Sequence, residues 1–197
     1  QVGGPAISDY VKDNALNARY FILPLQGGQT APVMNPYVHG PAWFVDKVTY
    51  ADNANKEIEA VGRIDLRREA VADKRFQDVL KASAVQDSTA SVKLTKYMSD
   101  RLEYDVYSAK GGVIVFSEVY YPGWTATVDG QEATLGRADY LLRALNVAPG
   151  RHKIVLTFHP KSVATTETIA YIAYAAIVIA LLVAAYLGYR RKRTGAK

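Results

Sequence analysis

The chain has 197 residues, enough for one ordinary domain or two small ones. Its formal charge is +5, but five of its 24 basic residues lie after residue 189, and the other 19 balance the 19 acidic residues. The body is therefore neutral, which argues against nucleic acid as a partner. The absence of cysteine excludes disulfides and thiolate metal sites.

Residues 1–87 show a mixed α/β pattern. Apolar residues recur at helical spacing from Ile7 to Ala15, and ARYFILPL (residues 18–25) is typical of a short strand that Pro24 ends. A turn region rich in Gly and Pro follows, and WFVDKVTY (residues 43–50) then predicts one strand.

Two short helices are expected after that strand. The first has Ala54, Ile58 and Val61 on one face. In the second, Asp73 caps a turn that carries Phe76, Val79 and Leu80.

Residues 88–160 change character and predict a β domain. About six strands are expected between residues 91 and 159, with Leu102, Tyr104 and Val106 on one face of one strand. The segment VIVFSEVYY is apolar on both faces, as in a central strand. Asp129-Gly130 predicts a two-residue hairpin loop. Such close spacing, with Gly and Pro turns, favours an antiparallel sandwich.

Residues 161–189 predict a linker and a transmembrane helix. From Ile169 to Tyr189 the chain runs 21 residues without a charge, Pro, Asn or Gln. About 20 apolar residues suffice to cross the hydrocarbon core of a bilayer. The alternative is a buried helix of a soluble protein, but so long an uncharged run is rare in a core.

The tail, residues 190–197, indicates the orientation. Its basic cluster favours the cytoplasmic side, which places residues 1–168 outside the cytoplasm. A tail-anchored protein with a cytoplasmic domain is the competing hypothesis, but it would have to move four consecutive basic residues across the membrane. Because the first residues carry no export signal, we expect the sequence to be a fragment of a longer protein.

The stretch YYPGWTATVDG (residues 120–130) carries the candidate binding residues. Tyr121 and Trp124 offer flat faces on which a sugar ring can stack, or they close the edge of the sandwich core. Arg137 and Arg143 suit phosphate groups of an envelope polymer, or they pair with Glu118, Asp129 or Asp139 on neighbouring strands.

No residue pattern points to catalysis. Glycoside chemistry usually needs two facing carboxylates, whereas Asp129 has a sufficient role in its turn and Glu118 is expected to be solvated or ion-paired. The three histidines, His39, His152 and His159, do not have metal-ligand spacing. We therefore predict no catalytic residue, no metal site and no cofactor in this chain.

Residues 120–160, from YYPGW to LTFHP, followed by one membrane helix and a basic tail, closely resemble the C-terminal end of the bacterial YfhO family of polytopic membrane proteins. LNARYFIL (residues 16–23) and GPAWFVDKV (residues 40–48) also resemble family segments. The resemblance implies a GT-C type glycosyltransferase of the bacterial cytoplasmic membrane, which uses polyprenyl-phosphate sugars to modify cell-envelope polymers. GT-C enzymes carry their key acidic residue in an extracytoplasmic loop near the N-terminus, so the resemblance carries no catalytic residue over to this chain.

The sequence thus predicts a mainly β (α+β) fold: a mixed N-terminal portion, an antiparallel sandwich-like extracytoplasmic domain and one membrane helix. Its expected function is that of the accessory domain and membrane anchor of the glycosyltransferase. The partners are then the lipid bilayer, a polyprenyl-phosphate sugar and an envelope glycopolymer. The alternative is a membrane-tethered carbohydrate-binding or scaffolding module with no enzymatic parent.

Overall fold

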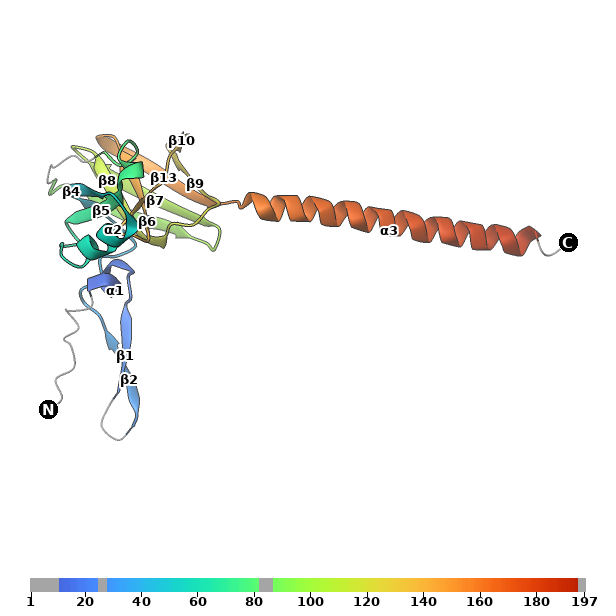
Figure 1. The fold of residues 1–197 in the computed structure, drawn as a ribbon, viewed down its shortest axis with the longest axis horizontal. Coiled ribbons are helices and arrows are strands. Elements are labelled where there is room, and N and C mark those ends of the chain that lie inside the picture. The colour runs from blue at the N-terminus through green and yellow to red at the C-terminus, as the bar shows by residue number, and fades with distance from the viewer. Residues whose placement is uncertain (1–10, 25–27, 82–86, 195–197) are drawn as a thin grey trace. The chain divides into compact units, whose positions relative to one another are not determined.

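The structure, a computed structural model, describes residues 11–24, 28–81 and 87–194 (Figure 1). The chain divides into two units, of which one ends at Phe158 and the other begins at His159. Most of the first unit is β structure and the second is a single helix. The predicted mainly β fold with a C-terminal apolar helix is confirmed.

One sheet has five antiparallel strands in the order β10-β9-β13-β7-β6. Its strands are β6 (Ser91–Tyr97), β7 (Arg101–Ser108), β9 (Trp124–Val128), β10 (Gln131–Ala133) and β13 (Gly150–Phe158). The alternation in β7 buries Leu102, Tyr104 and Val106 as the sequence predicts.

The other large sheet has six strands in the order β3-β8-β12-β11-β5-β4. Its strands are β3 (Ala42–Val45), β4 (Lys47–Ala51), β5 (Glu69–Asp73), β8 (Gly112–Val119), β11 (Gly136–Ala138) and β12 (Leu142–Val147). Strands from both sides of residue 87 therefore hydrogen-bond in one sheet, and residues 91–159 contain eight strands.

The six-stranded sheet is buried on both faces, as β8 shows. Ile114 and Phe116 point into a core that the sheet shares with the five-stranded sheet. Val113 and Val115 point into a second core on the opposite face. A strand buried on both sides needs apolar residues at every position, which explains the unbroken apolar run and confirms that β8 is central.

The single strand expected at residues 43–50 is wrong, because Asp46 divides it. β3 pairs with β8 at one end of the six-stranded sheet, and β4 pairs with β5 at the other. The main-chain N–H of Asp46 donates to the carbonyl of Arg68, and its carboxylate accepts from Arg68 Nε at 2.9 Å. Since one residue separates the two end strands, the sheet curls back on itself around the second core.

The pair β4 and β5 is parallel, so the sheet is not wholly antiparallel as expected. Helix α2 (Ala54–Val61) provides the crossover that parallel neighbours require. Asn53 caps it by accepting a hydrogen bond from the main-chain N–H of Lys56.

The helix α2 is confirmed, but its predicted buried face is wrong in part. Glu57 and Val61 are buried, whereas Ile58 is exposed. The second expected helix is a single 3₁₀ turn, η2 (Lys74–Phe76), and Asp73 caps it as predicted by accepting from the N–H of Arg75.

The Asp-Gly hairpin is confirmed between β9 and β10, where Val128 and Gln131 are register partners. Asp129 and Gly130 both have positive φ, 52° and 84°, as a two-residue loop of this kind requires. Asp129 also accepts from the main-chain N–H of Lys153 and pairs with His152, so its role exceeds the turn.

The N-terminal part forms a separate two-stranded ribbon. Helix α1 (Val11–Ala15) is part of the predicted helix, and its expected apolar residues Ile7 and Tyr10 lie outside the described residues. The predicted strand is confirmed as β1 (Tyr20–Pro24), which pairs with β2 (Thr30–Met34) from the turn-rich region. Figure 1 shows this ribbon standing clear of the two larger sheets.

Helix α3 (Lys161–Thr194) forms the second unit. Within the described part of the chain, its segment Thr165–Arg190 is the one helix long and apolar enough to span a bilayer, with a mean hydropathy of 2.4. None of that segment is buried against the protein, as expected of a helix whose surroundings are lipid.

The turn before β8 packs closely against the turn between β12 and β13. Gly111 has a φ of +69°, and a Cβ there would lie 2.7 Å from the carbonyl oxygen of Val147. Gly130 has a similar φ of +84° but open space at the same position. We expect Gly111→Ala to reduce the free energy of unfolding by about 1–3 kcal/mol more than Gly130→Ala does. Denaturant unfolding in detergent micelles measures both, and equal losses would contradict the proposed crowding.

Candidate functional site

A groove of about 440 Å³ lies along β9 and β10. Residues 120–127 line one part of it and Glu132–Leu135 the other. The lining combines aromatic rings with threonine hydroxyls and the carboxylate of Glu132. Apolar faces beside a few polar groups are what small-molecule and sugar sites usually present.

Tyr121 and Trp124 both line the groove, but they differ in exposure. Pro122-Gly123 turns the chain between them, with φ +104° at Gly123, and the Tyr121 ring lies 6.3 Å from the ring of Phe158, centroid to centroid. Tyr121 is 60% exposed, whereas Trp124 is half-buried against the core between the sheets. The Trp124 ring lies 5.3 Å from the ring of Phe158, centroid to centroid. The stacking face that the sequence suggested is therefore offered best by Tyr121.

Arg143 covers the Trp124 ring from within the protein. Its guanidinium carbon lies 4.0 Å from the ring centroid, and its Nη2 donates to Glu118 Oε2 at 3.1 Å. Arg143 is only 1% exposed, and burial lowers its pKa while Glu118 opposes that shift. The predicted pairing with Glu118 is confirmed, and Arg143 is too deeply buried to meet a phosphate in this conformation.

Arg137 lies directly opposite Arg143 in the pairing of β11 with β12 but turns towards helix α2. Its Nη2 donates to Glu57 Oε2 at 2.6 Å, and the main-chain N–H of Tyr140 donates to Glu57 Oε1 at 2.9 Å. Like charges on opposite strands repel, so each arginine has its own carboxylate. Tyr121 and Trp124 thus line one groove, whereas Arg137 belongs to a different, buried cluster.

A comparison with protein families matches residues 69–170 to the family described as bacterial membrane protein YfhO. The match covers slightly more than half of the chain and runs from β5 into α3. The chain belongs to the YfhO family. Among curated proteins none matches it. The segment shared with YfhO includes the whole groove and both arginines.

The sequence did not predict the roles of two acids in this YfhO chain. Glu57 is fully buried, and burial raises its pKa while the charge of Arg137 opposes the rise. Asp139 is buried in a turn with a φ of +52°, where its Oδ1 accepts from the N–H of Val71 at 2.9 Å. Asp139 was expected as a possible partner of Arg137 or Arg143, but these arginines pair with other acids and Asp139 accepts from the main chain of Val71. No pattern singled out Glu57.

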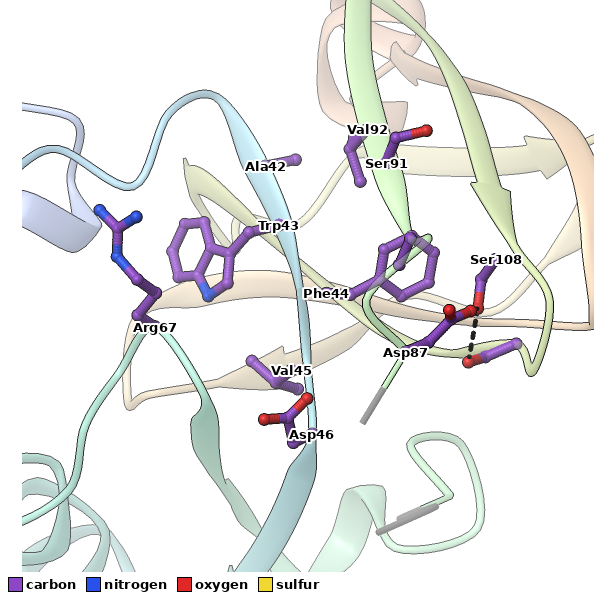
Figure 2. A pocket seen from close by; sticks show the side chains of 12 residues that line it. Ala42, Trp43, Phe44, Val45, Asp46, Arg67, Asp87, Ser91, Val92 and Ser108 are labelled. Carbon is purple, nitrogen blue, oxygen red and sulfur yellow. Dashed lines mark hydrogen bonds between the residues drawn. The ribbon is translucent and has the colours of Figure 1, made fainter. Parts of the chain in front are cut away.

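A second cavity, of about 250 Å³, lies beside β3, and Figure 2 shows Trp43 and Phe44 pointing to opposite sides of that strand. Several of its polar groups already have partners within the protein. Asp87 Oδ2 accepts from Ser108 Oγ at 2.7 Å, and Trp43 Nε1 donates to the carbonyl of Leu66 at 2.9 Å. Hydrogen bonds hold the pKa of Asp87 well below its usual range. This cavity therefore offers fewer free polar groups to a ligand than the groove does.

Asp139 predicts a dependence of stability on pH. Burial raises its pKa from 3.8 to about 7, against the opposing hydrogen bond from Val71, and the nearby charge of Glu57 adds to the rise. Between these two values the folded state keeps a proton that the unfolded chain has released, so stability falls as the pH rises. The slope is at most about 1.4 kcal/mol per pH unit.

In Asp139→Asn the amide oxygen still accepts from Val71, but the titrating group is gone. We expect the variant to lose less stability than the wild type between pH 4.5 and pH 7. Unfolding free energies across this range measure the effect, and the exposed Asp105→Asn serves as the control. Parallel pH profiles for wild type and Asp139→Asn would rule out Asp139 as the titrating group.

Proposed function

We propose that this chain is the C-terminal extracytoplasmic domain and last membrane helix of a GT-C type glycosyltransferase. The parent enzyme uses polyprenyl-phosphate sugars to modify cell-envelope polymers, and its catalytic carboxylate lies in another part of the parent protein. The YfhO family match and the membrane helix support the placement in a membrane protein.

The role of this domain is to hold the acceptor polymer in the groove along β9 and β10. The exposed ring of Tyr121 carries this proposal, because it is a large flat apolar face at the edge of a hydroxyl-lined groove. Thr125, Thr127 and Glu132 supply hydrogen-bonding groups along the same wall. A sugar ring stacks its C–H face on an aromatic ring and turns its hydroxyls to such groups.

Tyr121→Ala tests the acceptor site. We expect it to weaken binding of an envelope glycopolymer to the full chain in lipid nanodiscs by about five- to tenfold, which corresponds to roughly 1–1.4 kcal/mol. Tyr97→Ala is the matched control, since Tyr97 is similarly exposed but lies on β6, at the opposite edge of the same sheet. Titration calorimetry measures both variants.

Two further results bear on the same proposal. If Tyr121→Ala and Tyr97→Ala bind like the wild type, the groove is not the acceptor site. If the groove binds glycopolymer but the parent protein transfers no sugar from a polyprenyl-phosphate donor, the chain is a membrane-tethered binding module instead.

The orientation of the membrane helix has a separate test. We expect residues 1–168 outside and the basic tail in the cytoplasm, as the tail's charge favours. Because the chain has no cysteine, Ser88→Cys and Lys197→Cys each introduce one thiol. In intact cells that make the parent protein with any cysteines outside this chain replaced by serine, a membrane-impermeant maleimide should label Cys at 88 only. Labelling at 197 without permeabilisation would reverse the orientation.

A further inference from the structure

The ribbon of β1 and β2 carries an apolar face that no other described element covers. Across the two strands the register pairs Tyr20 with Met34 and Ile22 with Pro32 on this face. Tyr20 is 64% exposed, Ile22 75% and Met34 64%. The ten residues of the two strands include no charge, and their side-chain polar groups are the hydroxyls of Tyr20 and Thr30.

Such a ribbon is unusual as a water-facing element. A two-stranded hairpin is marginally stable at best in water without a surface to pack on. Exposed edge ribbons are normally protected by charged side chains, above all lysine, and this one has none. The apolar face therefore needs an occupant.

Addition of another strand is disfavoured by the prolines. Pro24 and Pro32 each lack the N–H that a neighbouring strand would use, and proline in a sheet faces away from the paired side. The outer edges are thus short of donors. An occupant that makes apolar contact without main-chain pairing fits the ribbon better than an extended peptide does.

A short segment joins the first unit to the membrane helix. Phe158 ends β13, and the apolar run of α3 begins at Ile169, so ten residues join them, about 15 Å if helical. Arg19 immediately precedes the ribbon and is exposed. A cation and a tyrosine beside an uncharged apolar face match the headgroup and acyl regions of a bilayer.

We propose that the β1–β2 ribbon lies in the membrane interface, with Tyr20, Ile22 and Met34 facing the lipid. The ribbon lies flat rather than crossing the bilayer, because its open edges need water or headgroups as hydrogen-bond partners. It is then a second membrane contact of the chain, independent of the acceptor site proposed above.

The cysteine-free chain allows a direct test. The full chain is reconstituted in nanodiscs of phosphatidylcholine and phosphatidylglycerol, with a polarity-sensitive fluorophore on a single introduced cysteine. The probe site is Ile22→Cys. Asp105→Cys, exposed on β7, is the control on the large sheet, and Leu23→Cys reports the opposite face of the ribbon.

We expect the Ile22→Cys probe to emit at shorter wavelength than the Asp105→Cys probe. Lipids with a nitroxide near the headgroup should quench it at least twofold more strongly than either control. Emission equal to that at position 105 would overturn the proposal. A blue shift without quenching by nitroxide lipids would also overturn it, since a second copy or another protein would then cover the ribbon. Unchanged circular dichroism verifies that each labelled variant is folded.

Discussion

The burial of the six-stranded sheet on both faces is the constraint on which the rest of the first unit depends. In β8, Ile114 and Phe116 hold the five-stranded sheet, while Val113 and Val115 hold β4, β5 and the residues around α2. Neither layer can separate without exposing one side of this strand to water, at a cost of about 25 cal/mol for each Å² of apolar surface. The strand therefore fixes the groove wall and the arginine pair relative to each other.

The two arginines that face each other across β11 and β12 show how a sheet buried on both faces accommodates charged side chains. Each of them pairs with its own carboxylate. Arg143 stacks beneath Trp124 and uses Glu118 of the neighbouring strand, whereas Arg137 uses Glu57 from α2. A buried ion pair adds little net stability when it forms. Removing one partner is strongly destabilising, because it leaves the other charge buried and unpaired. Glu57 therefore ties the helix of the parallel crossover to the sheet. These pairings leave Arg143 buried and Arg137 partly exposed, and neither guanidinium lines the groove.

Local patterns allowed accurate prediction wherever neighbours in the sequence decide the structure. The alternation in β7, the Asp-Gly loop after β9 and the apolar run of α3 were all predicted correctly. The break at Asp46 was not, because it depends on Arg68 and on two strands that close the sheet from opposite ends. Similarly, hydrophobic periodicity predicts that Ile58 is buried. The structure buries Glu57 instead, because Glu57 forms an ion pair with Arg137, which is distant in the sequence. Distant partners of this kind leave no trace in local spacing.

Of the four candidate binding residues, the structure brings Tyr121 and Trp124 to one groove and places the two arginines elsewhere. Aromatic residues around a Pro-Gly turn indicated where a sugar ring can stack, and the groove lies there. Which ring is available follows from Arg143, since a guanidinium 4.0 Å from the Trp124 centroid occupies a face that a sugar would need. Tyr121 is left as the exposed ring at the turn. A single stacking face with hydroxyls along a groove favours weak binding of a repeating polymer, which is why we propose that this groove positions an acceptor and does not convert it.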